Sequence, residues 1–230
     1  MVGVLRANIR CTISNPASTD LARSSRSLTL GKVSRWLRYV ALGDSITEES
    51  CDPGWADLLA RILDGNARLQ SSSLEFTNLG ELDPRARSVV ERRVPHAVAL
   101  GADLVSMVIG GGDLLAARAD PDALAAEVEG GVAALRASGA DVLLATCFDP
   151  PYAFFRSSLR GRVATYNANL WSIARTHGAF TLDLWGARDL QAVRMWAENR
   201  QHLTPDGHRL LASKAAHSLG VPYFEVTPRR

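Results

Sequence analysis

Ser45 and His202 are the two residues of this chain whose types could together support nucleophilic catalysis. Ser45 lies in "VALGDSITEES" (40–50), directly after an apolar run, and His202 lies in "ENRQHLTPDGH" (198–208). A serine hydroxyl becomes a useful nucleophile when a nearby base takes its proton and donors stabilise the oxyanion that forms. The sequence around Ser45 also fits a helix N-cap, and GDS alone is a weak signal of catalysis, so two interpretations of this serine stay open.

Three aspartates follow apolar runs and are candidates for acid–base chemistry. Asp44 precedes the serine, Asp83 follows "NLGEL" (78–82), and Asp113 ends "GGGD" (110–113). Crowded carboxylates raise one another's pKa, and an acid that titrates near neutrality can transfer protons. The Asp83-Pro dipeptide is also common in turns, so a turn residue is the alternative interpretation of Asp83.

A ligand-facing loop is expected in "TCFDPPYAFFRSSLRG" (146–161). Tyr152, Phe154 and Phe155 would form an aromatic wall suited to an apolar or planar ligand, and Arg156 could pair with a carboxylate on it. The alternative is that these aromatic side chains close the core.

Five short apolar runs, separated by helical patterns, predict the strands that position these residues. The expected strands are 38–42, 74–79, 104–109, 141–146 and 179–184, and the helices lie near 54–64, 85–100, 121–138 and 160–177, with a last helix from Pro205. Asp120-Pro121 and Thr204-Pro205 signal helix starts, and Gly139 signals a helix end. This alternation predicts an α/β fold with a mainly parallel sheet, whose ligands collect at the carboxyl ends of the strands.

Composition excludes several classes of function. The chain has 230 residues, 47% hydrophobic and 22% charged, with a net charge of +2. These values give no case for a nucleic-acid or membrane-surface partner. The dispersed Cys11, Cys51 and Cys147 fit a reducing cytoplasm and argue against a zinc site. No cofactor motif is found, because "GGGD" lacks dinucleotide-loop spacing.

Three segments are expected along the chain. Residues 1–37 are rich in Ser and Arg with Asp20 as their single acid, and are expected to be a flexible leader, with a transit peptide as the alternative. Residues 38–220 form the expected domain, and 221–230 a C-terminal tail.

From Arg38 to Leu219 the chain resembles the SGNH (GDSL) hydrolase superfamily. The matching pieces are "GDSITE" (43–48), "NLGELDPRA" (78–86), "GGGDLL" (110–115), "RVATYNANLWSIARTHGA" (162–179), "DLWG" (183–186) and "HLTPDGH" (202–208). The resemblance implies a flavodoxin-like three-layer α/β/α sandwich with a five-stranded sheet, and esterase, lipase or acyltransferase activity without a metal. It places Ser45 on the nucleophile and His202 on the general base.

The family's other catalytic positions differ in this chain. Asp83 stands where the family has its oxyanion glycine, Gly112 where it has an asparagine, and Asn199 where it has the aspartate behind the histidine. Asp113 keeps the family's adjacent aspartate, and Asp44 fits a structural role in the nucleophile turn. A register slip of the alignment would instead make Gly80 the oxyanion glycine or Glu198 the acid.

These departures leave three interpretations of function. The first is a site repurposed for non-hydrolytic acid–base chemistry on a small organic molecule, such as cyclisation, elimination or ring opening in a specialised pathway. The second is a Ser45/His202 esterase or acyltransferase with weak activity. The third is a catalytically silent binding protein. The oligomeric state and the substrate are not indicated by the sequence.

Overall fold

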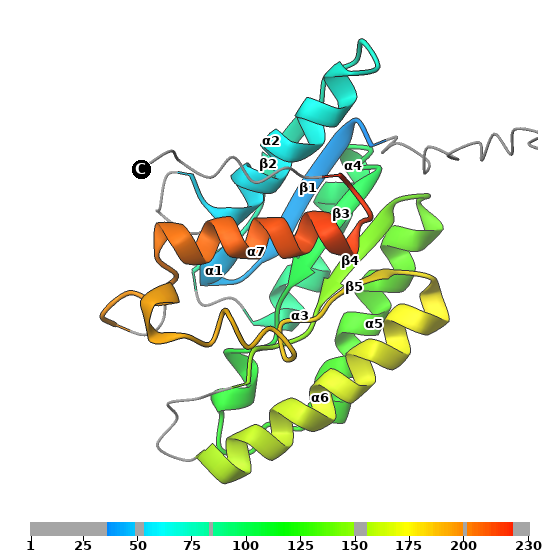
Figure 1. Ribbon diagram of the computed structural model, residues 1–230. Coiled ribbons are helices and arrows are strands. Elements are labelled where there is room, and N and C mark those ends of the chain that lie inside the picture. The colour runs from blue at the N-terminus through cyan, green and yellow to red at the C-terminus, as the bar shows by residue number, and fades with distance from the viewer. Residues whose placement is uncertain (1–35, 49–52, 83–84, 150–155, 200–201, 223–230) are drawn as a thin grey trace, which may run out of the picture. The chain divides into compact units, whose positions relative to one another are not determined.

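Five parallel strands form one sheet. The computed structural model describes residues 36–48, 53–82, 85–149, 156–199 and 202–222, with only the backbone for 156–158. The strands are β1 (Arg38–Gly43), β2 (Glu75–Asn78), β3 (Leu104–Val108), β4 (Asp141–Ala145) and β5 (Phe180–Leu182). Their order is β2-β1-β3-β4-β5, the flavodoxin-like order, and each neighbouring pair is parallel (Figure 1). The predicted strands and the predicted fold class are confirmed.

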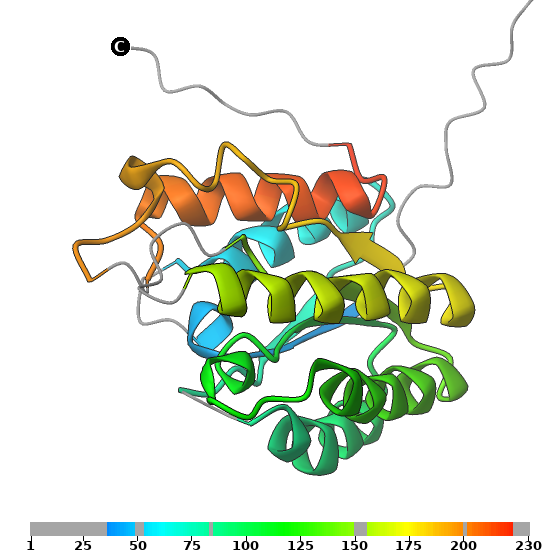
Figure 2. The same cartoon turned by 90° about the horizontal axis from the view of Figure 1, so that it is seen from below.

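Helices cover both faces of the sheet and make the three layers seen in Figure 2. One face carries α2 (Trp55–Arg68) and α7 (Pro205–Ser218), which pack against each other. The other carries α3 (Ala86–Ser88), η1 (Val89–Arg93), α4 (Val94–Ala99), α5 (Pro121–Ala137) and α6 (Arg156–His177). Three short helical segments lie in connections: α1 (Ser45–Glu48), η2 (Asp113–Leu115) and η3 (Val193–Met195).

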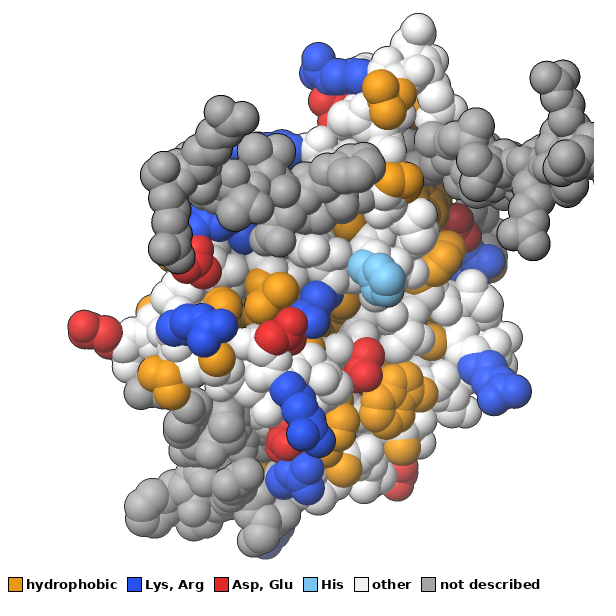
Figure 3. Space-filling model, in the orientation of Figure 1, with side chains coloured by type: hydrophobic (Ala, Val, Ile, Leu, Met, Phe, Trp, Pro, Cys, Tyr) orange, Lys and Arg blue, Asp and Glu red, His pale blue; other side chains and the backbone are white. Residues whose placement is uncertain are grey.

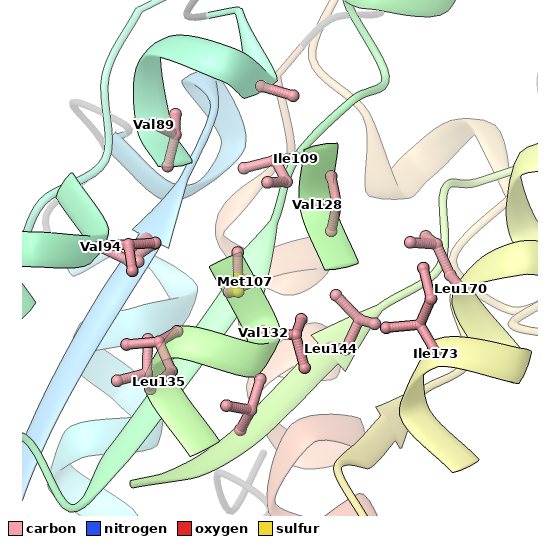
Figure 4. Close-up of a cluster of buried hydrophobic side chains, with 14 of the residues drawn as sticks. Val89, Val94, Met107, Ile109, Val128, Val132, Leu135, Leu144, Leu170 and Ile173 are labelled. Atoms are coloured by element: carbon pink, nitrogen blue, oxygen red, sulfur yellow. The ribbon is translucent and has the colours of Figure 1, made fainter. Parts of the chain in front are cut away.

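The sheet separates two apolar clusters because alternate side chains of a strand point to opposite faces. In β1, Val40 and Leu42 belong to the cluster under α5 and α6, whereas Tyr39 and Ala41 belong to the cluster under α2 and α7. Figure 4 shows the first cluster, in which side chains of α5 and α6 meet those of β3 and β4. Both faces of β1 are therefore buried, which explains its unbroken apolar sequence.

The predicted helix signals are present in the structure. The Asp120 carboxylate accepts hydrogen bonds from the N–H groups of Asp122 (3.0 Å) and Ala123 (3.2 Å), and the Thr204 hydroxyl accepts one from Gly207 (3.2 Å). Gly139 follows α5 with a φ of +94°, a conformation that favours glycine.

Two helix expectations need correction. The expected helix over 85–100 is interrupted by a π-helical turn, η1, in which Val94 donates to the carbonyl of Val89. The next residue, Pro95, has no N–H and cannot continue the α-helical hydrogen bonds, which accounts for the change to the π-helical pattern. In addition, α6 begins at Arg156, so the loop expected to reach residue 161 ends earlier.

The described part of the chain begins with contacts to the domain. The Trp36 indole donates to an Asp141 carboxylate oxygen (2.9 Å) and packs edge-on against Phe180, while the Leu37 N–H donates to Asp103 (2.8 Å). Residues 1–35 and 223–230 lie outside the described residues, so the expected leader and tail stay predictions.

The face covered by α7 carries mixed charge. Lys and Arg side chains alternate there with Asp and Glu, and the hydrophobic side chains on view lie in separate small areas (Figure 3). Within the described residues, no helix is both long and apolar enough to cross a membrane.

Candidate active site

Ser45 lies at the sharp turn from β1 into α1. The Asp44 N–H donates to the Val108 carbonyl (3.0 Å), and the Asp44 carboxylate accepts from the Ile46 N–H (3.1 Å). A Cβ on Gly43 would collide with the Thr47 side chain, so this turn requires glycine. Asp44 thus caps α1, and the Ser45 hydroxyl, which is half-buried, is not needed as the cap.

Asn78 ties the end of β2 to this turn. Its side-chain amide donates to the Thr47 carbonyl (2.8 Å), and its oxygen accepts from the Gly80 N–H (2.9 Å). A Cβ on Gly80 would overlap the backbone of Glu48. Gly80 therefore allows the close approach of β2 to α1, and its N–H is committed to Asn78. An oxyanion role for Gly80 would require that hydrogen bond to break.

The loop after β3 passes beside the serine turn. Gly110 has a φ of +95°, and a Cβ there would collide with the Tyr166 ring. The position of a Gly111 Cβ lies 3.8 Å from the Asp44 carboxylate and 4.0 Å from the Cys147 sulfur. The loops after β1, β3 and β4 thus meet around Gly111. Gly112 is exposed, with open space where a side chain would begin.

Asp113 joins this loop to α3. Its carboxylate accepts from the Ala86 N–H (3.1 Å) and lies 3.6 Å from the Arg85 guanidinium. On the N-terminal side of Asp83, the Glu81 N–H donates to the Gly43 carbonyl (3.1 Å). Asp83 lies outside the described residues, but the chain on both sides of it is attached to loops of the candidate site.

The four residues that follow β4, 146–149, each contact a different part of the chain, and the first two do so by hydrogen bonds. The Thr146 hydroxyl accepts from the N–H groups of Leu184 (2.9 Å) and Trp185 (3.1 Å). The Asn167 amide accepts from the Cys147 N–H (2.8 Å) and donates to its carbonyl (2.9 Å).

The next two residues make side-chain contacts. Phe148 packs edge-on against Trp196, with ring centroids 5.2 Å apart. Asp149 forms a bidentate ion pair with Arg160 (2.8 and 3.1 Å), whose guanidinium lies 4.9 Å from the centre of the Trp185 ring. This segment therefore forms a fixed platform at the carboxyl edge.

Cys147 and Tyr166 are residues of this region that the sequence reasoning missed as a pair. Burial raises the pKa of the Cys147 thiol, and the charges of Asp44 and Asp113 raise it further. Burial also raises the pKa of Tyr166, whose hydroxyl donates to the Ile109 carbonyl (3.2 Å). Both groups are therefore held protonated at neutral pH. Their only sequence signal was the place of Cys147 at the end of an apolar run.

His202 lies on a hairpin that leads into α7. Trp196 and Leu203 form an antiparallel bridge, the Ala197 N–H donates to the His202 carbonyl (2.9 Å), and the Asn199 side-chain oxygen accepts from the His202 N–H (3.2 Å). Asn199 and Glu198 are exposed, and His202 is half-buried. Figures 1 and 2 show this segment and α1 at the same end of the sheet.

The remaining expected site residues are distributed as follows. Tyr152, Phe154 and Phe155 lie outside the described residues, and Arg156 is described only as the first backbone position of α6. The second histidine of the "HLTPDGH" segment, His208, was not among the expected site residues; it is fully buried, and its Nδ1 accepts from the Trp55 N–H (3.0 Å). The described part of the chain holds no cluster of three or more His, Cys, Asp or Glu side chains able to bind a metal ion.

Comparison with solved structures gives the same fold. LAE5, an alpha/beta hydrolase enzyme from the metagenome of Lake Arreo, is 23% identical with a TM-score of 0.68, covering 80% of this chain and 95% of its own. Axe2, an acetylxylan esterase from Geobacillus stearothermophilus, is 19% identical with a TM-score of 0.69, covering 84% and 97%. A putative GDSL-like lipase from Parabacteroides merdae is 16% identical with a TM-score of 0.69, covering 80% and 96%.

Comparison with curated proteins finds no match. The model of the GDSL-like lipase/acylhydrolase family, however, matches residues 41–210, a span that contains both the serine turn and the histidine hairpin. The chain therefore belongs to the GDSL-like lipase/acylhydrolase family, within the SGNH hydrolase superfamily.

Proposed function

We propose that this member of the family uses the hydrolase cleft for non-hydrolytic acid–base chemistry on a small organic substrate. The reaction class is a cyclisation, elimination or ring opening in a specialised pathway. Ser45 and His202 would hydrogen-bond the substrate, and Asp83 would transfer the proton. The observation that carries the proposal is that an asparagine, Asn199, stands three residues before His202, where the family resemblance places an aspartate.

Acyl transfer through Ser45 would create a positive charge on His202. An aspartate next to such a histidine stabilises the imidazolium and fixes the ring tautomer. Asn199 instead supplies a neutral oxygen, which accepts the His202 backbone N–H. The turn is thus kept without the negative charge that would stabilise a His202 imidazolium, which supports a reaction other than acyl transfer through Ser45.

The oxyanion donors are depleted as well. Gly112 has no side-chain amide, and the Gly80 N–H is committed to Asn78. The open space at Gly112 means that packing does not forbid an asparagine there. A missing donor of this kind costs on the order of 10²–10³ in turnover. Asp83, if ionised, would oppose an oxyanion, whereas if protonated it would donate to one.

The proposal extends to the partner and the compartment. A near-neutral net charge of +2 supports a small-molecule partner over a nucleic acid or membrane surface, and the three scattered cysteines support the cytoplasm. The aromatic residues Tyr152, Phe154 and Phe155, with Arg156, would face a planar substrate that carries a carboxylate.

Carboxyl carbon NMR on protein labelled at aspartate tests the role of Asp83 without knowledge of the substrate. We expect one aspartate to titrate above pH 6, and its signal to be missing in Asp83→Asn. If every aspartate titrates below about pH 5, Asp83 is an ordinary turn residue and the proposal fails.

The second candidate is an esterase or acyltransferase that uses Ser45 and His202. Family membership favours it. So does the N-cap of α1, because Asp44 and not Ser45 accepts the hydrogen bond from the helix. It requires that both Ser45→Ala and His202→Ala abolish ester turnover. A catalytically silent binding protein would instead show no turnover and no effect of either substitution.

A further inference from the structure

The histidine hairpin needs an anchor beyond its own hydrogen bonds. Those bonds shape the turn, from the bridge between Trp196 and Leu203 to the bond between Asn199 and the His202 N–H. They do not determine where the turn lies relative to the serine side of the site. The buried side chains of Met195 and Leu203 fix its base against the layer of α7.

Phe148 provides a contact between the hairpin and the end of β4. It is itself immobilised, because Cys147 before it is bonded at both backbone atoms by the fully buried Asn167 and Asp149 after it is paired with Arg160. The rings of Phe148 and Trp196 form a T-shaped pair with an interplanar angle of 79°. Such T-shaped pairs have a preferred geometry, so the contact orients as well as attracts.

Trp196 is held on its other side too. Its indole N–H donates to the Leu190 carbonyl (2.7 Å), and its backbone pairs with Leu203, the neighbour of His202. The tryptophan ring is therefore fixed between the segment after β5 and the platform after β4. A shift of this ring would move the strand that carries His202.

We infer that Phe148 and Trp196 act as a pair of positioning residues that set the place of His202 relative to the platform after β4. The inference rests on the proposed role of His202 in the site. Neither residue needs to touch the substrate.

The test is imidazole nitrogen–proton correlation NMR on Phe148→Leu, Trp196→Leu and the double variant, with the His202 signal assigned by its loss in His202→Gln. We expect both single variants to displace the His202 signal, and the double variant to displace it no further than the larger single effect. Trp196→Phe keeps a ring against Phe148 and should largely restore the wild-type position. Thermal unfolding confirms that each variant is folded.

Trp36→Leu is the matched control, because Trp36 is also a half-buried tryptophan in a T-shaped pair, but its partners Phe180 and Asp141 lie at the starts of β5 and β4, away from the carboxyl edge of the sheet. It should leave the His202 signal in place. An unmoved His202 signal in folded Trp196→Leu, or equal displacement by Trp36→Leu, would overturn the inference. Displacement together with ordinary titration of all aspartates would keep the inference and refute only the acid–base role of Asp83.

Discussion

Restoring the family's residues at three positions should create ester hydrolysis in this cleft. The triple variant Asn199→Asp, Gly112→Asn, Asp83→Gly tests this directly. An aspartate at 199 keeps the oxygen that accepts the His202 N–H. Gly112 has a φ of −65° and a ψ of −35°, which any residue adopts, and has open space around the new side chain. The substitutions at positions 199 and 112 should therefore leave the fold intact.

The expected gain follows from the chemistry of each group. Replacing the aspartate of a serine–histidine–aspartate triad by asparagine lowers turnover by about 10⁴, so the reverse change can add up to that factor. A side-chain oxyanion donor at 112 adds on the order of 10²–10³. Such effects are not additive, and we expect a combined gain of at least about 10³ in kcat.

The assay is hydrolysis of p-nitrophenyl acetate, with thermal unfolding as the check on folding. A matched variant that carries Gly112→Ala in place of Gly112→Asn has a side chain but no donor, and should lose most of the oxyanion part of the gain. Adding Ser45→Ala to the triple variant should return turnover to background. A folded triple variant no more active than wild type would refute the assignment of these three positions.

Two further predictions concern glycines with positive φ and buried groups that titrate at high pH. Gly110→Ala should lower the melting temperature much more than Gly139→Ala, because both have φ near +95° but only Gly110 is pressed against the Tyr166 ring; equal losses measured by thermal unfolding would contradict this. Burial raises the pKa of Cys147, Tyr39 and Tyr166 in the folded protein. The unfolded chain therefore loses these protons first, and the free energy of unfolding should fall as pH rises above 9.0, the ordinary pKa of a thiol. Each group contributes a slope of up to about 1.4 kcal/mol per pH unit, so Tyr39→Phe should flatten the alkaline limb in urea titrations.

The fold could be predicted because its signals are local. The strands β1, β3 and β4 are buried along most of their length, which requires the continuous apolar runs visible in the sequence. Caps such as Asp120 and Thr204 act within three residues of their own position. The break before Pro95 was also signalled locally, but a helical pattern extends across it and hides the π-helical turn.

The site could be predicted only in part because its geometry depends on distant contacts. The serine turn and the histidine loop have short sequence motifs. The pairing of Phe148 with Trp196 joins residues 48 positions apart in the sequence numbering, and the clamp of Asn167 on Cys147 spans 20. Contacts between such distant residues leave no periodic pattern of apolar residues in the sequence. Asp113 likewise reads as a cleft acid in the sequence, whereas in the structure its carboxylate binds the start of α3.

The most direct test of the proposed function is turnover of a short-chain p-nitrophenyl ester series by the wild-type protein beside Ser45→Ala. If the site does not catalyse acyl transfer, turnover should lie near the uncatalysed background in both proteins. Robust wild-type turnover that disappears in Ser45→Ala would contradict the proposal and make the protein a serine esterase that functions with Asn199 behind its histidine.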